Sequence, residues 1–307
     1  MQKLNVDDII YFTKKLIYSS IIVFSIGFIQ FYLLREEFAL FRGIIEAISN
    51  HGEIKYSVNA FSMMGLNRMY GPFTGPNEFG LFASIILTLI SYLLYTHKSY
   101  NHKINYNLLL FTFILGLIAL IHTFSRVSFF FLICSTIIIL LVEKKIKLFK
   151  PPLFLFFLFF LSILILLIPQ IMHVFMDSIT FKELSANARI DFFLEGLIKI
   201  AKNPMGIGLG LVRYGSSSQV FHTEIFWWLV ALEISIVGFI LYISFYIINI
   251  NKMILMIFSN SNNMFTVPAI SLLLTYVICG FASVIILEPI ITILIWLICS
   301  LGIKKYE

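Results

Sequence analysis

Charge is scarce in this chain. Charged residues make up 12% of the 307 positions, whereas hydrophobic residues make up 60% and Phe alone occurs 33 times. A water-soluble protein of this length could not cover so much apolar surface with polar atoms. The composition therefore excludes an ordinary soluble enzyme and predicts an integral membrane protein surrounded by membrane lipid. We expect no nucleic-acid partner.

Cysteine is scarcer still, and metal-binding patterns are missing. The three cysteines, Cys134, Cys279 and Cys299, all fall inside apolar runs, and their spacing fits no zinc site. No Asp-x-Asp motif occurs in the loops predicted below to face outward. We therefore expect no disulfide framework, no metal and no cofactor. The N-terminus also lacks a small-residue cleavage site after its first apolar run, so we expect a retained first helix.

Long apolar runs take the place of these features. Residues 152–169 contain no charge and are long enough to cross a bilayer core of roughly 30 Å. The hydropathy pattern predicts an all-α, polytopic membrane helical bundle of about eight transmembrane helices, forming a single membrane domain over residues 1–307. The predicted spans are 16–34, 77–96, 105–122, 127–142, 152–170, 225–250, 265–286 and 289–303.

Lysine gives the predicted orientation. If the N-terminus is cytoplasmic, twelve of the sixteen lysines fall on the cytoplasmic side, as the positive-inside rule requires. Both termini are then cytoplasmic. Two long segments face outward, a first outer loop over residues 35–76 and a large outer loop over residues 171–224.

Arginine follows the opposite pattern. All six arginines fall on the predicted outer side: Arg35, Arg42, Arg68, Arg126, Arg189 and Arg213. The planar guanidinium binds phosphate and carboxylate through two parallel hydrogen bonds, which lysine cannot do. The distribution favours an anionic ligand at the outer surface. The alternative is chance within a set of six in a lysine-rich chain.

Two motifs at predicted outer helix ends contain an arginine. In residues 68–78, two Gly-Pro pairs form a turn after Arg68, and Asn77 is expected to cap the next helix with Glu78 in its first turn. In residues 121–128, Ser125 and Arg126 form a short hairpin between two spans. An arginine so close to hydrocarbon is a functional candidate. The alternatives are a structural turn for the first motif and snorkelling to the interface for the second.

The large outer loop carries the next two motifs. Residues 187–202, which include Arg189, have the period of an amphipathic helix lying on the membrane surface. After Asn203-Pro204 comes Gly206-Ile207-Gly208-Leu209-Gly210, which predicts a tight backbone turn with amides able to face an anion.

His222 lies at the mouth of the sixth span, and a histidine there could accept a proton from an alcohol, with Glu224 orienting it. A structural role at the helix entrance is the alternative. Glu233 is expected to be a hydrogen-bonded bundle residue.

In this order the motifs resemble the O-antigen ligase and polymerase family (the Wzy/WaaL type). Its Arg-x-x-Gly turn with Pro-Asn is matched by Arg68, Gly71, Pro76 and Asn77, and its Ser-Arg by Ser125 and Arg126. Its arginine on an amphipathic segment, its Asn-Pro, its Gly-x-Gly-x-Gly and its histidine before a membrane helix are matched by Arg189, Asn203, Pro204, Gly206, Gly208, Gly210 and His222. The family's Glu-x-Gly-Ile-x-Gly appears as residues 233–238, with Ser235 in place of the first glycine.

The resemblance implies an inverting, metal-independent glycosyltransferase in the bacterial plasma membrane, with its active site facing the periplasm or the exterior. Its substrate would be a polyprenyl-diphosphate-linked oligosaccharide, and a chain-length regulator or flippase could be its protein partner. The implied catalytic residues are His222, Arg126 and Arg189, and the implied substrate-binding residues are Arg68, Asn77, Ser125, Glu224, Gly206 and Gly208. A polymerase of O-antigen, capsule or exopolysaccharide is preferred over an O-antigen ligase because Thr223-Glu224 follow His222 where ligases often have Asn. The chain could instead be a lipid-oligosaccharide flippase or a structural subunit of an export complex.

Overall fold

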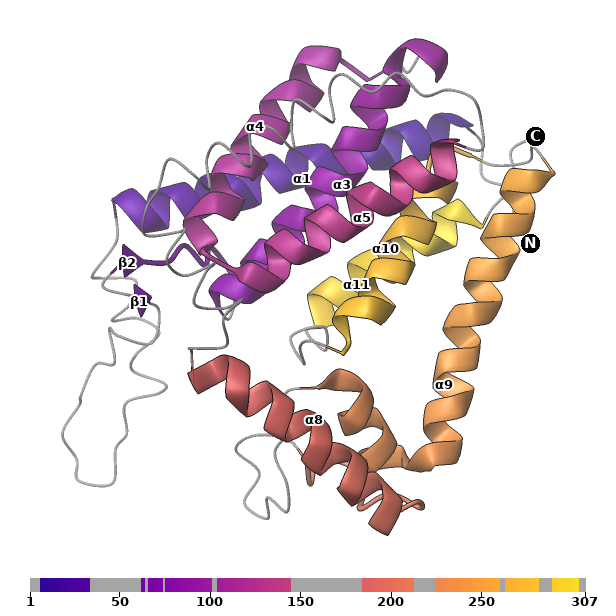
Figure 1. Cartoon of the computed structure of the whole chain (residues 1–307). Coiled ribbons are helices and arrows are strands. Elements are labelled where there is room, and N and C mark those ends of the chain that lie inside the picture. Colours follow the sequence, from indigo (N-terminus) through magenta and orange to yellow (C-terminus); the bar gives the residue numbers. More distant parts are fainter. Residues whose placement is uncertain are drawn as a thin grey trace. The chain divides into compact units, whose positions relative to one another are not determined.

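Helices make up nearly all of the structure, a computed structural model. It describes residues 6–33, 62–63, 66–73, 75–100, 104–144, 184–212, 223, 225–259, 263–281 and 289–303. The described helices are α1 (Val6–Tyr32), α3 (Pro76–Tyr100), α4 (Tyr106–Thr123), α5 (Arg126–Lys144), α8 (Leu184–Lys202), α9 (Phe226–Phe258), α10 (Thr266–Cys279) and α11 (Pro289–Gly302) (Figure 1). Two short strands, β1 (Ser62–Met63) and β2 (Leu66–Asn67), pair antiparallel. The all-α expectation is confirmed for this part of the chain.

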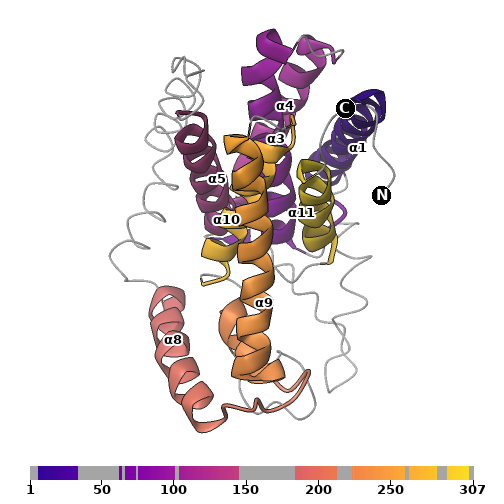
Figure 2. The same cartoon turned by 90° about the vertical axis from the view of Figure 1, so that its right-hand side faces the viewer.

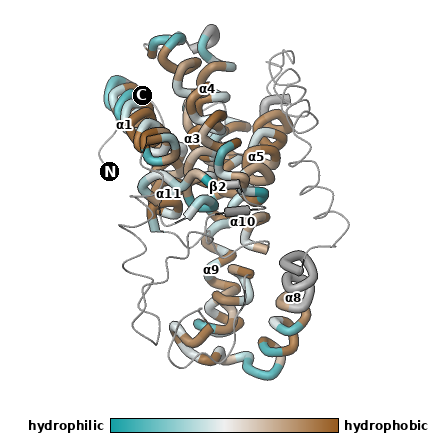
Figure 3. The backbone as a smooth tube through the Cα atoms, turned by 90° about the vertical axis from the view of Figure 1, so that its left-hand side faces the viewer, coloured by the Kyte–Doolittle hydropathy of each residue, from teal (hydrophilic) through white to brown (hydrophobic). Residues whose placement is uncertain are grey.

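Among the described helices, four are long and apolar enough to cross a membrane: α1, α3, α4 and α9. Three others, α5, α10 and α11, are apolar but shorter. Apolar residues cover these helices along most of their length (Figure 3), and many large ones are exposed, for example Phe111 in α4 and Leu241 in α9. Such continuous exposed apolar surface is incompatible with water and compatible with lipid. The chain is therefore a membrane protein, and the predicted number of about eight spans stays a prediction.

The helix boundaries differ from the predicted spans at three places. The predicted span 265–286 corresponds to α10, which ends at Cys279. The first helix begins at Val6 rather than near residue 16, because residues 6–16 contain no Gly or Pro and Asp7 and Asp8 suit the positive first turn of a helix. The sixth span extends to Phe258 rather than residue 250. The predicted span 152–170 lies outside the described residues.

The chain divides into two compact units, described separately below. Unit 1 consists of Met1–Ile137, Met253–Leu272 and Glu288–Glu307, and unit 2 of Ile138–Lys252 and Leu273–Leu287. In unit 1, α4 packs against both α1 and α3 (Figures 1 and 2). In the most apolar window of α3, 89% is buried, against 33% in α1 and α4. The central helix of this unit is therefore α3.

Small and hydroxyl-bearing residues join α3 to α5. The hydroxyl of Ser84 donates to the Ser128 carbonyl at 2.7 Å, and the Thr88 and Ser135 hydroxyls lie 2.7 Å apart. Gly80, one turn before Ser84, has no room for a Cβ beside Ser128. Gly80, Ser84 and Thr88 recur every four residues, the spacing of close membrane-helix packing in which polar side chains bond across the interface. This contact holds the start of α5 next to the start of α3.

Candidate functional site

Arg68 connects three elements at one end of unit 1. Its Nε donates to the Thr123 carbonyl at 2.7 Å, and its Nη2 donates to Asn77 Oδ1 at 2.7 Å. The amide of Met69 donates to the His122 carbonyl at 2.9 Å. These bonds tie the segment before α3 to the last turn of α4. The turn motif therefore serves to place Arg68, and Arg68 in turn holds the hairpin.

The expectation that Asn77 caps α3 is wrong. The helix begins one residue earlier, at Pro76, and the amide of Phe79 donates to the Gly75 carbonyl at 3.2 Å. Proline is suited to the first helical position because its φ is already helical and it has no amide to satisfy there. The side-chain oxygen of Asn77 is consequently available to Arg68. Glu78 does lie in the first turn of α3, as predicted.

Positive charge gathers around this turn. Burial lowers the pKa of the Arg68 guanidinium from its usual value, Glu78 raises it, and the nearby charge of Arg126 lowers it again. Arg126 is the first residue of α5 and therefore adds its charge to the positive end of that helix. Two arginines and a helix N-terminus, offset by Glu78, make this end of unit 1 suited to binding an anion.

Ser125 sets the start of α5. It is completely buried, and its Oγ accepts hydrogen bonds from the Ser128 hydroxyl at 2.7 Å and from the Ser128 amide at 3.4 Å. This is the geometry of an N-cap residue. Only Phe124, at φ 47°, and Ser125 separate α4 from α5. The predicted hairpin is therefore confirmed, and Ser125 positions Arg126 rather than being open to a ligand itself.

In unit 2, the glycine-rich turn closes a break in α9. Gly206, Gly208 and Gly210 all have positive φ, which confirms the predicted turn. The amide of Ile207 donates to the Leu232 carbonyl at 2.6 Å, and the Pro204 carbonyl accepts from the Ile236 amide at 3.1 Å. A Cβ on Gly206 would lie 3.0 Å from that same Leu232 oxygen. The turn thus supplies hydrogen-bond partners for backbone groups of α9 that have no helical partner at the interruption.

The interruption is at Ser235, whose φ of 89° and ψ of 164° are not helical. This backbone region is open almost only to glycine. Ser235 occupies the position of the first glycine in the Glu-x-Gly-Ile-x-Gly pattern. The serine is used as a cap, since its Oγ accepts from the Gly238 amide at 3.2 Å and so begins the second half of α9.

The acidic side chain that this turn binds belongs to the protein itself. The amide of Gly210 donates to Glu233 Oε1 at 3.0 Å. Glu233 is therefore the hydrogen-bonded bundle residue that was predicted. Because Gly206 is packed against α9, the turn offers a ligand less free backbone than its glycine content implied.

The structure does not describe the side chains of His222, Glu224 or Arg189. His222 and Glu224 lie outside the described residues. Arg189 lies within α8, where the described side chains begin at Phe192. Arg126 belongs to unit 1 and Arg189 to unit 2.

No protein-family model, curated protein or solved structure matches this chain. The resemblance to the O-antigen ligase and polymerase family therefore rests on the sequence motifs.

One conspicuous group of side chains was missed by the sequence reasoning. Trp227 and Trp228 are adjacent at the start of α9. The ring of each packs against a glycine that is distant in the sequence. The ring of Trp227 packs on Gly280 and its Nε1 donates to the Val277 carbonyl at 2.9 Å. The ring of Trp228 packs on Gly196 of α8, and its buried Nε1 has no hydrogen-bond partner among the described residues.

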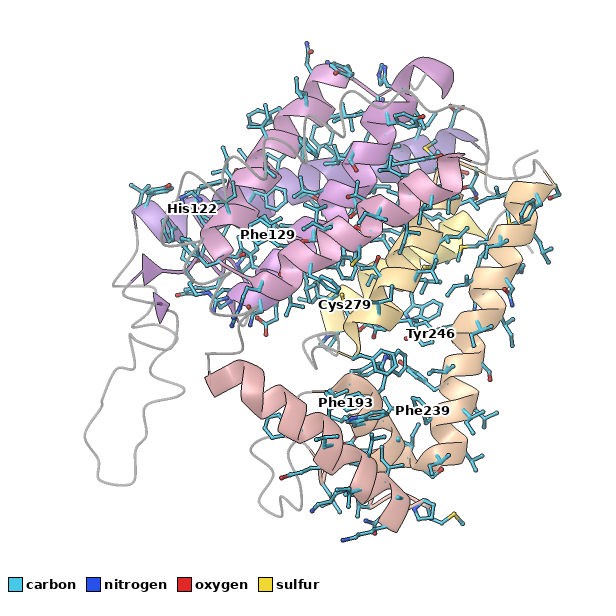
Figure 4. All side chains as sticks on the ribbon, viewed as in Figure 1. His122, Phe129, Phe193, Phe239, Tyr246 and Cys279 are labelled. Carbon is cyan, nitrogen blue, oxygen red and sulfur yellow. The ribbon has the colours of Figure 1, made fainter. Side chains whose placement is uncertain are left out.

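An aromatic cluster surrounds these rings in unit 2. The ring of Phe193 lies 5.2 Å from Trp228, that of Phe239 lies 6.0 Å from Trp227, and that of Tyr246 lies 6.1 Å from Trp227 (Figure 4). A Trp-Trp pair is a sequence signal for such a cluster, but it does not identify the glycines.

The sequence predicted no metal site, and such a site would be built from His, Cys, Asp or Glu side chains. Among the residues that the structure describes, no three of these gather to hold a metal ion. Cys134, Cys279 and Cys299 form no disulfide bond in the part of the chain that the structure describes.

Proposed function

We propose that the protein is a polysaccharide polymerase of the bacterial plasma membrane. It transfers a growing glycan from a polyprenyl diphosphate to a hydroxyl of a lipid-linked repeat unit on the outer leaflet. The proposal includes about eight spans, an active site on the non-cytoplasmic face and a metal-independent, inverting reaction. Its protein partner is a chain-length regulator or a flippase.

The observation that supports this proposal is the proximity of Arg68 and Arg126. Hydrogen bonds to Thr123 and Asn77 hold the Arg68 guanidinium, and Arg126, at the N-terminus of α5, lies near enough for its charge to lower the pKa of Arg68. Sites lined by one sign of charge concentrate ions of the opposite sign, and arginine binds phosphate groups through two parallel hydrogen bonds. A lipid diphosphate is such an anion, and it belongs at the boundary of an apolar bundle.

The reaction requires charge stabilisation and proton removal. As the acceptor hydroxyl attacks the anomeric carbon, the bond to the diphosphate oxygen breaks and its electron pair stays on the diphosphate. Arginines facing that oxygen stabilise the developing charge. We assign this role to Arg126 and Arg189 and assign Arg68 to diphosphate binding. His222 is the proposed base that takes the hydroxyl proton, with Glu224 orienting it.

A reconstituted transfer assay tests the proposal. The purified protein is given a lipid-diphosphate-linked repeat, with chelator, across pH 5–8. We expect Arg126→Lys and Arg189→Lys to lose about 10²–10³-fold in rate because lysine cannot form two parallel hydrogen bonds. His222→Gln should also fail. Arg35→Lys and Arg42→Lys are matched controls that should retain activity. Normal transfer by both Arg126→Lys and Arg189→Lys would overturn the assignment.

The ligase alternative is separated in cells. In a deletion strain, single repeats left on lipid indicate a polymerase. Long lipid-linked chains that never reach an acceptor indicate a ligase. Single lipid-linked repeats trapped on the cytoplasmic leaflet, rather than on the outer leaflet, indicate a flippase.

A further inference from the structure

A tyrosine and a histidine form a hydrogen-bonded pair at the end of unit 1 that carries Arg68. His122 lies in the last turn of α4, with Nδ1 2.8 Å from the Ile118 carbonyl oxygen and Nε2 2.9 Å from the Tyr32 hydroxyl of α1 (Figure 4). A carbonyl oxygen can only accept, so Nδ1 carries the hydrogen. In the neutral ring Nε2 is then an acceptor, and the Tyr32 hydroxyl donates to it.

This tautomer determines what Tyr32 can offer to a ligand. Its single hydroxyl hydrogen is already donated to His122. The phenolic oxygen keeps its lone pairs, so it can accept a hydrogen bond from an outside group. Tyr32 is 61% exposed. The pair therefore presents a fixed acceptor oxygen at an open surface.

Two further aromatic rings hold the pair in place. The ring of Phe31 lies 5.0 Å from Tyr32 and 5.1 Å from His122, in both cases edge to face. The ring of Phe28 stacks with Tyr32 at 6.4 Å. Such ring contacts stabilise orientation beyond simple burial. The exposed part of the Tyr32 ring is thus a rigid apolar face beside a polar edge.

Arg68 is joined to the same helix end. The carbonyl of His122 accepts from the Met69 amide, and the next carbonyl, that of Thr123, accepts from Arg68 Nε. Two successive residues of α4 therefore make these contacts: His122 bonds to Tyr32, and Thr123 bonds to Arg68.

We propose that Tyr32 and His122 form a sugar-binding site. It takes the first sugar of the lipid-linked glycan while Arg68 and Arg126 hold the diphosphate. The acceptor oxygen suits a sugar hydroxyl, and the ring face suits the apolar C–H face of a pyranose. This inference rests on the proposed function. The competing explanation is an aromatic residue at the membrane boundary, which needs no fixed histidine partner.

Binding to two probes tests the site. One probe is the lipid-diphosphate-linked repeat extracted from the producing cells, and the other is the same polyprenyl diphosphate without sugar. We expect Tyr32→Phe and His122→Phe in the full chain to weaken binding of the sugar-bearing probe by about 3–10-fold, the value of one hydrogen bond. Binding of the sugar-free probe should stay within about twofold of wild type. Arg68→Ala should weaken both.

Tyr18→Phe is the matched control, because Tyr18 also lies in α1 and is similarly exposed. It should bind both probes as wild type does. If Tyr32→Phe behaves like Tyr18→Phe, or weakens both probes equally, the sugar site is overturned while the proposed function stands. If wild-type protein binds neither probe, the proposed function fails and the inference fails with it. Elution volume and thermal midpoint of each variant confirm that it is folded.

Discussion

Alanine normally stabilises a helix more than glycine does. The backbone conformation at Ser235 should reverse this order of stability. At an ordinary helical position, glycine is about 1 kcal/mol less stable than alanine because it loses more conformational freedom. Ser235 has a φ of 89° within α9. A residue with a Cβ held in this region carries about 1–3 kcal/mol of strain, which glycine does not carry.

The comparison of two variants isolates this strain. Both Ser235→Ala and Ser235→Gly lose the hydrogen bond from the Gly238 amide, so the cap contribution of about 1 kcal/mol cancels between them. The alanine variant keeps the strain and the glycine variant is released from it. Subtracting the entropic disadvantage of glycine, Ser235→Gly should exceed Ser235→Ala by up to about 2 kcal/mol in free energy of unfolding.

Ser244 provides the control within the same helix. Its hydroxyl donates to the Ile240 carbonyl at 2.7 Å, and its backbone is helical. There, Ser244→Ala should be more stable than Ser244→Gly by about 1 kcal/mol. The assay is unfolding of purified protein in mixed micelles with increasing sodium dodecyl sulfate, followed by tryptophan fluorescence. The same order at both positions, with alanine ahead of glycine, would refute the strained break.

Three further predictions concern other parts of the chain. Arg68→Lys should lower the free energy of unfolding by about 1–3 kcal/mol, because lysine cannot reach the Thr123 carbonyl and the Asn77 side chain at once. The thermal midpoint of the variant, compared with that of the wild type, measures this. Trp227→Phe should destabilise more than Trp228→Phe by about 1–3 kcal/mol, since only the Trp227 substitution leaves a partly buried carbonyl, that of Val277, without its donor. Equal losses would contradict this. A cysteine at Ser217 should react with an impermeant maleimide in intact cells or spheroplasts while one at Lys147 is protected; the reverse pattern would place the large loop in the cytoplasm.

Much of the helical architecture could be predicted because it depends on local composition. Long apolar runs bounded by polar segments are sufficient to locate α3, α4 and α9. The hairpin before Arg126 follows from the few residues between two such runs. The end of α8 at Lys202 follows from Asn203-Pro204.

The parts that were missed depend on contacts between distant residues. The run Ile234-Ser235-Ile236-Val237 is so apolar that its sequence gives no sign of a break in the helix. The break forms because Pro204 and Ile207 supply the hydrogen bonds that the helix loses there. Asn77 has the sequence context of a helix cap, but its side-chain oxygen accepts a hydrogen bond from Arg68, which lies outside α3. Such pairings become visible only when the chain is folded.

The break in α9 also determines how much of that helix can lie in the hydrocarbon. Its 33 residues would form a rod of about 50 Å if straight, which is much longer than a bilayer core of roughly 30 Å. Divided at Ser235, the part over residues 236–258 is about 35 Å long and nearly matches the core, whereas residues 226–234 extend about 14 Å and cannot cross it. The shorter part can therefore turn along the membrane boundary, where α8 packs on it through Gly196 and Trp228. Straightening α9 would create a hydrophobic mismatch of roughly 20 Å, so the bilayer itself favours the broken form.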